Sequence, residues 1–462
     1  MNINIGLFGH IDHGKTELAK RLSEIISTSA LDKPKESRER GITIDLGFSS
    51  FILDKYRITL VDAPGHSELI KTAVNAGKII DLALLVVDAK EGPKTQTGEH
   101  LIVLDLLNIP TIVVINKIDI ASKEEIERTK KLMKIILDST NNLKNSKIVE
   151  ISAKTGDGID ELKKIIKETL DNLTIVRDVN NFFKMPIDHA FKIKGIGTVV
   201  TGTILKGKVK VGDTLIVYPT NLEVKVKSIQ CFKENVEEAK AGNRVGMNLS
   251  GIEPEQIFRG CVLSSLENNL KLTDKFVAKI KIVDIFKYNL TPKMKVHLNI
   301  GLLTISARIY PFKKLNIDNK EENIVLNEIK AGDECYCLFE LEKKVMMEEG
   351  DKILILRLDL PATTLRIAGI GEVIGFDNVE LKKLSVKKGK VVKRKNKLVV
   401  EGLATSKKSA EKLIGERVYI KDKNIVGIIK ETFGTKGALL VDFNGDVEGG
   451  EEVELIRVRK WG

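Results

Sequence analysis

Residues 9–16 read GHIDHGKT, which fits the pattern G-x-x-x-x-G-K-T of a phosphate-binding loop. An alternating apolar stretch at residues 2–8 precedes the loop, and apolar residues at helical spacing follow it over residues 17–26. The motif requires this order of strand, loop and helix, because loop N–H groups and the helix N-terminus then face a phosphate. The stretch therefore predicts a nucleotide-binding α/β domain.

The residues of this loop have distinct expected roles. Gly9 and Gly14 let successive backbone N–H groups curl around the phosphates. Lys15 supplies a cation to the β- and γ-phosphates, and the Thr16 hydroxyl is expected to ligate Mg²⁺. The predicted phosphate contacts come from His10, Asp12, His13, Gly14, Lys15 and Thr16.

Three further motifs each follow a predicted strand, at residues 57–61, 111–116 and 148–152. In the first, DAPGH at residues 62–66, Asp62 is placed to hold magnesium and the N–H of Gly65 to detect a γ-phosphate. In the second, Asp119 can accept both N–H groups of guanine, so the site selects GTP over ATP. The predicted guanine contacts are Asn116, Lys117, Asp119, Ser152, Ala153 and Lys154. Four motifs in this order predict a GTPase that binds GTP, GDP and Mg²⁺.

Length and composition bound the remaining possibilities. A chain of 462 residues predicts three or four domains, and 42% hydrophobic residues exclude a disordered or fibrous chain. No apolar stretch reaches the ~18 residues that a membrane helix needs. Four scattered cysteines do not form a disulfide framework, and the pair Cys335 and Cys337 is interpreted as core packing. We therefore expect a soluble, cytoplasmic protein without a membrane partner.

After the first domain, short alternating runs are broken by glycine at close intervals, which is typical of small β-barrels. The predicted fold is an α/β P-loop GTPase domain followed by three small β-barrel domains. The predicted divisions are residues 1–178, 179–268, 269–382 and 383–462, and a lysine-rich linker is expected at residues 382–397.

Charge is distributed unevenly between these parts. Residues 1–178 hold 26 basic and 27 acidic residues, a net of −1, whereas residues 385–462 hold 18 and 11, a net of +7. A polyanion is therefore expected to meet the later domains. The basic run at residues 387–397 has no interleaved aromatic residue, which favours phosphate contact over base stacking, although a solvated linker fits the same pattern.

The order of motifs, with RGITI at residues 40–44 between the first two, resembles the translational GTPases of the elongation factor Tu class. This resemblance implies that Thr43 completes the magnesium shell and that His66 positions the attacking water on the ribosome. It also implies that Ile11 and Ile42 form a hydrophobic gate beside that histidine. GIGTVVTG at residues 195–202 is similar to the first β-barrel of the same class.

The fourth block resembles the appendage of selenocysteine-specific elongation factors of the SelB type. Initiation factor two gamma is the nearest alternative, but its GTPase domain usually carries paired C-x-x-C motifs and residues 1–178 contain no cysteine. The GTPase subunit of ATP sulfurylase shares only the first three domains. A scaffold that keeps nucleotide as a structural ligand is the alternative from another class, and the complete set of nucleotide residues disfavours it.

The amino-acid pocket implied by the resemblance lies against residues 186–191 and 242–246 and offers Asp188, His189 and Arg244. Selenocysteine is an anion at neutral pH, whereas serine is neutral, so a cationic pocket that is costly when empty would discriminate between them. The implied partners are selenocysteyl-tRNA, the ribosome, and the mRNA selenocysteine element or a protein bound to it. The chain is expected to act as a monomer at recoded UGA codons.

Overall fold

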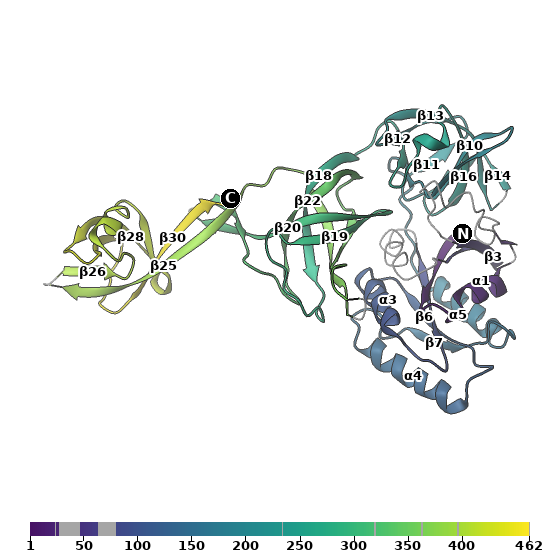
Figure 1. The fold of residues 1–462 in the computed structure, drawn as a ribbon, viewed down its shortest axis with the longest axis horizontal. Helices are drawn as coiled ribbons and strands as arrows, with labels where there is room; N and C mark the ends of the chain where they lie inside the picture. The colour runs from purple at the N-terminus through teal and green to yellow at the C-terminus, as the bar shows by residue number, and fades with distance from the viewer. Residues whose placement is uncertain are drawn as a thin grey trace.

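The computed structural model describes residues 1–23, 25–26, 47–62, 80–232, 234–317, 320–361, 364–394 and 397–461. Figure 1 shows an elongated molecule, with an α/β domain and a small β domain at one end, a second β domain in the middle and a third at the other end. This arrangement confirms the predicted succession of one α/β domain and three small β domains. No helix among the described residues is both long and apolar enough to cross a membrane.

The N-terminal domain is built on a seven-stranded sheet of order β2-β3-β4-β1-β5-β6-β7. The strands β4, β1, β5, β6 and β7 are parallel to one another, which places their carboxyl ends at one edge, whereas β3 is antiparallel to β4. The middle strands are fully buried, as expected for a parallel sheet covered on both faces. The strands are β1 (Asn2–Gly9), β2 (Ile25–Ile26), β3 (Gly47–Leu53), β4 (Tyr56–Asp62), β5 (Leu82–Asp88), β6 (Thr111–Asn116) and β7 (Lys147–Glu150). The helices are α1 (Lys15–Leu22), α3 (Thr95–Leu106), α4 (Lys123–Asp138) and α5 (Ile159–Asp171).

The helix predicted over residues 17–26 is shorter than expected. Helix α1 ends at Leu22, because Ser23 is extended, with ψ 132°. The next described residues, Ile25 and Ile26, pair with Ser50 and Ser49 of β3 as a short antiparallel strand. Two adjacent β-branched side chains suit a strand better than a helix end. Strand β3 itself was not predicted.

The second domain, at residues 184–264, contains a curved sheet of order β8-β17-β12-β13-β16-β10-β9. Inward-facing apolar residues such as Val200, Val217 and Met247 form its core, and they alternate with outward-facing ones. Its strands are β8 (Lys184–Pro186), β9 (His189–Ile193), β10 (Gly197–Thr203), β11 (Lys208–Lys210), β12 (Thr214–Tyr218), β13 (Leu222–Cys231), β14 (Glu234–Val236), β15 (Glu238–Lys240), β16 (Arg244–Ser250) and β17 (Val262–Ser264), with the 3-10 helix η3 (Pro254–Gln256).

The third domain is a six-stranded barrel that the β19–β20 pairing closes. Phe276, Phe339 and their neighbours fill it, and Cys335 and Cys337 are buried free thiols on β22, which confirms their interpretation as core residues. The strands are β18 (Lys271–Ile282), β19 (Lys295–Ile300), β20 (Leu303–Ile317), β22 (Glu334–Met347), β23 (Lys352–Leu356) and β24 (Ile367–Gly375). The additional strand β21 (Lys320–Val325) extends its sheet.

The fourth domain is a second closed set of six strands around its own core, which includes Val418, Leu439 and Leu455. Its strands are β25 (Leu381–Arg394), β26 (Lys397–Glu401), β27 (Arg417–Ile420), β28 (Ile425–Phe433), β29 (Ala438–Phe443) and β30 (Glu452–Lys460), with α6 (Lys407–Glu411) and η4 (Lys421–Lys423). In Figure 1, β25 and β30 form an arm that reaches from this domain to the third.

The predicted lysine-rich linker at residues 382–397 is wrong. Residues 381–394 form the single strand β25, which pairs with β30 from Lys382↔Lys460 to Lys390↔Glu452 and then with β26. Leu384 and Val386 are two residues apart and Val391 is buried in the core of the fourth domain, which is strand character that the many lysines conceal. Because β25 crosses the division predicted between residues 382 and 383, we propose that the fourth domain begins near residue 381.

Buried charges join the second and third domains. Lys184 Nζ lies 2.8 Å from Glu348 Oε1, and Lys206 Nζ lies 2.8 Å from the other oxygen of the same carboxylate. Asp351 adds a second carboxylate, 3.2 Å from Lys184 Nζ. The side chains of Lys184 and Glu348 are 6% and 4% exposed, so the four charges satisfy one another away from solvent. Between the first and second domains, Asn4 Nδ2 donates to the carbonyl of Gly242 at 3.0 Å.

Candidate functional site: a nucleotide loop and an interdomain pocket

The phosphate-binding loop has the backbone conformation that its glycines predict. Gly14 is the N-cap of α1 with φ 89°, and Asp12 has φ 64°. Gly9 has φ 135°, and a Cβ there would lie 2.2 Å from the carbonyl oxygen of Val86, so only glycine fits. The Lys15 amine donates to the carbonyls of Gly9 and His10, at 3.0 and 2.8 Å. The loop thus folds around its own lysine.

Helix α3 holds the start of this loop. His100 Nδ1 accepts the N–H of Gly9 at 3.1 Å, and both residues are buried. Gln96 Oε1 contacts Nδ1 of His10 and accepts the N–H of Ile11 at 3.4 Å. Sequence reasoning missed Gln96 and His100, and no local spacing could have revealed them, because they lie more than 80 residues from the loop.

His13 is uncharged at neutral pH. Its side chain is fully buried, and burial lowers its pKa to about 4, against a smaller opposing effect of the hydrogen bond to the Val86 carbonyl. At pH 7 a neutral His13 therefore adds no positive charge to that of Lys15.

The predicted guanine residues converge at the carboxyl ends of β6 and β7. The amide of Asn116 donates to the His13 carbonyl and accepts the N–H of Ala153, both at 2.9 Å. Ser152 Oγ donates to Asp119 Oδ1 at 2.7 Å. Asn116 therefore ties the phosphate loop to residues 152–154, while the exposed Asp119 is aligned by the buried Ser152.

One ion pair fixes the surroundings of these guanine-site residues. Lys117 has φ 67°, and its amine lies 2.8 Å from Asp88 Oδ2. Burial alone would raise the pKa of Asp88, but hydrogen bonds from Lys117 and from the N–H groups of Glu91 and Lys90 together lower it. Asp88 therefore remains ionised as the partner of Lys117.

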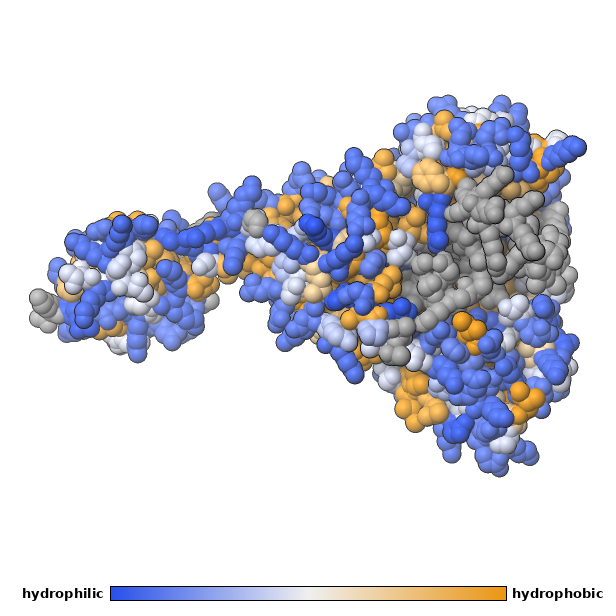
Figure 2. All heavy atoms as spheres, in the orientation of Figure 1, coloured by the Kyte–Doolittle hydropathy of each residue, from blue (hydrophilic) through white to orange (hydrophobic). Residues whose placement is uncertain are grey.

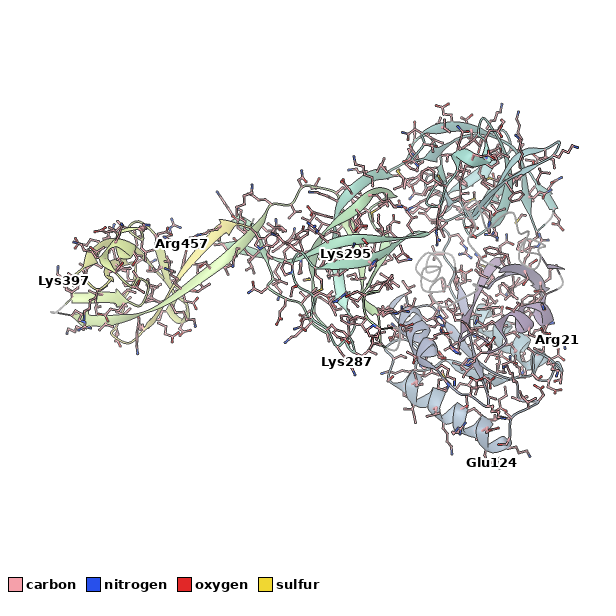
Figure 3. All side chains as sticks on the ribbon, in the orientation of Figure 1. Arg21, Glu124, Lys287, Lys295, Lys397 and Arg457 are labelled. Atoms are coloured by element: carbon pink, nitrogen blue, oxygen red, sulfur yellow. The ribbon has the colours of Figure 1, made fainter. Side chains whose placement is uncertain are left out.

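Arg21 of α1, labelled in Figure 3, holds the backbone of the guanine-site segment at residues 152–154. It donates to the Ala153 carbonyl at 2.9 Å and also contacts the carbonyl of Lys154. Lys154 itself is exposed. Arg21 is a further residue that the motif search missed.

Several of the predicted site residues lie outside the part of the chain that the structure describes. Ile42, Thr43, Gly65 and His66 are not among the described residues, and Asp62 is described only as the last residue of β4. Their roles stay predictions. Thr16 is exposed at the start of α1, and Ile11 is 46% exposed on the loop.

The second candidate site lies where the first two domains meet. Arg244 begins β16 and pairs with Thr203 of β10, whereas His189 begins β9 and pairs with Thr201 of the same strand. Directly paired residues share a face of the sheet, so His189, Thr201 and Arg244 lie together. Thr201 was not predicted, and among the described residues its buried hydroxyl has no hydrogen-bond partner.

Arg244 is held from both sides. Its guanidinium forms a close ion pair with Asp188, and its central carbon lies 3.1 Å from the ring centroid of Phe48 on β3 of the first domain. The side chains of Arg244 and Asp188 are 14% and 8% exposed. Burial lowers the pKa of Arg244, and the charge and hydrogen bond of Asp188 oppose this effect. The charge of Arg244 is therefore compensated by Asp188, the third residue predicted for this site.

Comparisons with known proteins bear on both sites. The model of the elongation factor Tu GTP-binding domain matches residues 1–172, and that of elongation factor Tu domain 2 matches residues 197–264. The model of domain III of archaeal selenocysteine-specific elongation factors matches residues 270–377. A selenocysteine-specific elongation factor of Methanocaldococcus jannaschii is 71% identical over 461 residues, which cover 100% of this chain and 98% of that protein. The chain belongs to the family of selenocysteine-specific elongation factors.

Solved structures agree with this assignment. The crystal structure of elongation factor SelB from Methanococcus maripaludis in complex with the GTP analogue GPPNHP is 59% identical and has a TM-score of 0.88, covering 100% of this chain and 99% of that one. A mouse selenocysteine-specific elongation factor is 36% identical over 67% of this chain and 56% of its own length. The predicted family and the predicted GTPase are thereby confirmed, and the chain binds GTP and GDP.

Proposed function

We propose that this GTPase carries selenocysteyl-tRNA to the ribosome at recoded UGA codons and hydrolyses GTP there. The observation that carries the proposal is the position of Arg244, a buried arginine at the boundary between the nucleotide domain and the first β domain. A carrier that accepted every standard side chain would gain nothing from a buried charge at that place. A carrier selective for an anionic side chain would gain affinity from a buried positive charge there.

The pocket residues have separate proposed roles. Arg244 supplies hydrogen-bond donors for a selenolate, because a guanidinium has five N–H donors and Asp188 engages only part of them. His189 supplies a donor from β9, which lies on the other side of β10 from Arg244. Asp188 keeps the empty pocket neutral, so that a neutral seryl group displaces nothing and gains nothing.

The nucleotide site fits a magnesium ion in its donor chemistry. Thr16 is exposed at the start of α1, close to the phosphate loop, and β4 ends at Asp62. A hydroxyl and a carboxylate suit Mg²⁺, which keeps several waters and needs few protein ligands. Among the described residues no cluster of three or more acidic, histidine or cysteine side chains offers a competing metal site. Thr16, Asp62 and Thr43 would hold the ion, which would neutralise charge on the phosphates.

The hydrolytic step is assigned to His66, which we propose positions the attacking water after Gly65 detects the γ-phosphate. Ile11 and Ile42 are the proposed hydrophobic gate. Ile11 is 46% exposed on the loop, and this exposure supports a role for it as one side of such a gate.

The basic fourth domain is the proposed contact to RNA. Strand β25 carries seven basic and no acidic residues over Leu381–Arg394. A strand presents these cations at fixed spacing, whereas a linker would not, so phosphate contacts along it need less ordering. The proposed partner is the mRNA selenocysteine element or a protein bound to it. We propose that the carrier acts as a monomer in the cytoplasm, where ribosomes work.

A protection assay with charged tRNAs tests the function. The protein is incubated with GTP or GDP and with selenocysteyl-, cysteinyl- or seryl-tRNA of the same tRNA body, and the rate of ester hydrolysis is measured. Protection of the selenocysteyl ester alone, and only with GTP, supports the proposal. Equal protection of all three esters, or none of any, would exclude a selenocysteine-specific carrier.

A further inference from the structure

The lone tryptophan of the chain lies at the junction of the third and fourth domains. Trp461 directly follows β30. Its backbone N–H donates to the carbonyl of Leu381, the first residue of β25, at 2.9 Å. In Figure 1 the two strands meet the third domain at this point, where the arm begins.

The indole ring packs against two residues of the third domain. Its centroid lies 5.5 Å from that of Tyr310, at an interplanar angle of 78°, which is the edge-to-face arrangement that aromatic pairs prefer. The amine of Lys293 lies 4.6 Å from the indole centroid, in the position of a cation–π contact. A half-buried tryptophan is thus held between a ring and a cation.

Both partners are themselves fixed. Tyr310 Oη donates to Glu340 at 2.6 Å, and Glu340 in turn lies 2.8 Å from the amine of Lys275. Lys293 has φ 70°, a backbone conformation that is costly for a lysine, and its N–H donates to the Ile309 carbonyl at 2.9 Å. The third domain therefore holds Lys293 in a strained turn whose side chain covers the indole.

Weaker contacts surround this group. Strand β25 pairs with β21 only at Asn323↔Leu381 and Ile324↔Lys382, and Lys382 lies 2.6 Å from Glu322. A small apolar cluster of Val277, Tyr310, Phe312, Val325 and Leu381, with Trp461 packed against it, is separate from the core of the fourth domain. The two domains therefore share a second, minor core at their junction.

We infer that Lys293, Tyr310 and Trp461 form a junction latch that fixes the orientation of the fourth domain relative to the third. Apart from Leu381 in the minor core, strand β25 joins the third domain through two register pairs and one ion pair, which by themselves would let a two-stranded arm bend and twist. An indole clamped by a ring and a cation resists rotation of the arm. The latch thus makes the RNA-facing domain move with the third domain, and its loss would let the two domains reorient independently.

The inference is tested by measuring the distance between the two domains by pulsed electron paramagnetic resonance. Spin labels are attached at Lys343→Cys on β22 and Lys430→Cys on β28, both exposed positions, whereas the four native cysteines are buried and free. The full-length protein is used throughout. A narrow distance distribution is expected, and it should broaden markedly in Trp461→Leu and in Lys293→Met.

Lys287→Met is the matched control, because Lys287 is an exposed lysine of the same domain, labelled in Figure 3, and the cation over the indole is that of Lys293 instead. It removes one positive charge without touching the latch and should leave the distribution narrow. Since Trp461 is the only tryptophan, its fluorescence reports the same event directly. Quenching by acrylamide should rise in Lys293→Met and stay unchanged in Lys287→Met.

Normal nucleotide binding and an unchanged circular dichroism spectrum show that each variant is folded. A broad distribution in the unaltered protein would overturn the inference, because no latch would then be holding the domains. A narrow distribution in either Trp461→Leu or Lys293→Met would also overturn it. None of these outcomes depends on whether the chain carries selenocysteyl-tRNA.

Discussion

Replacing Arg244 by asparagine should abolish the preference for selenocysteyl-tRNA without weakening binding of seryl-tRNA. Arg244 is 14% exposed, and Asp188 and Phe48 hold its guanidinium in place. A selenolate that meets the remaining N–H donors gains one charge-assisted hydrogen bond, which contributes about 1.5–3 kcal/mol. This corresponds to roughly tenfold to somewhat over a hundredfold in affinity. The bond is absent for serine, so Arg244→Asn should bring the two affinities together by that factor.

Asp188→Asn should act in the opposite direction. The carboxylate of Asp188 competes with a selenolate for the same guanidinium and repels it as a like charge. Its removal leaves a buried cation without a partner, a state that favours any incoming anion. The ratio of selenocysteyl- to seryl-tRNA affinity should therefore rise in Asp188→Asn, even though the variant itself unfolds more easily.

The assay is protection of the aminoacyl ester in the presence of GTP, with both esters on the same tRNA body. Because the ratio compares two ligands on one protein, a loss of stability affects both and cancels. Arg259→Asn, the other arginine within residues 184–264, is the matched control and should leave the ratio unchanged. The ratio of selenocysteyl- to seryl-tRNA affinity should also shrink when the pH is lowered below the selenol pKa, because the selenocysteine side chain is then neutral.

Two results would refute this reasoning. If Arg244→Asn weakened the binding of both charged tRNAs equally, the arginine would stabilise the fold or contact the tRNA backbone, and it would not select selenium. If Asp188→Asn lowered the ratio as much as Arg244→Asn, the ion pair would act as one unit and Asp188 would not compete with the substrate.

Four further outcomes are expected. Asp119→Asn should reverse the preference of the nucleotide site from GTP to xanthosine triphosphate, measured by competition, and an unchanged preference would exclude Asp119 from guanine recognition. His66→Ala should leave GTP affinity within about threefold while ribosome-stimulated hydrolysis falls by orders of magnitude, since the residue serves the transition state only; normal stimulated turnover would remove it from the mechanism. Replacing Lys390 and Lys393 by glutamine should reduce the salt dependence of RNA binding by roughly one unit of slope per lost phosphate contact, and an identical slope would place the RNA elsewhere. Since the pKa of His13 is about 4 in the folded protein and 6.5 ordinarily, the unfolded chain takes up a proton first as pH falls. The free energy of unfolding should therefore drop by up to ~3 kcal/mol between pH 7 and pH 4, and this part of the drop should be missing in His13→Asn.

The nucleotide site could be predicted from the sequence because its chemistry depends on short spacings. The loop at residues 9–16 and the residues of the guanine site all follow strands of one parallel sheet, and parallel strands end at a common edge. Asn116 and Ala153 therefore meet as the motif order implies. The residues that hold these motifs in place, such as His100 and Arg21, could not be found, because nothing local marks a contact made across the fold.

At the boundary of the first two domains, the candidate residues could be named from the sequence, but their electrostatics could not. Asp188 and Arg244 were identified from the resemblance, yet their ion pair and the ring of Phe48 depend on how two domains pack. In the fourth domain the basic residues could be predicted from the sequence, but the strand that carries them could not. Its first strand was misread as a linker because lysines occupy exposed positions on both faces of β25, and only the pairing with β30 reveals the strand.

The joint between the second and third domains should respond to heat differently from the rest of the molecule. Lys184, Lys206, Glu348 and Asp351 meet there with little exposure to solvent. The penalty for taking such charges out of water falls as temperature rises, whereas stabilisation by apolar burial levels off. On warming, this joint should gain strength relative to the apolar contacts around Trp461. The arm formed by β25 and β30 should therefore loosen at a temperature at which the second and third domains still move as one body.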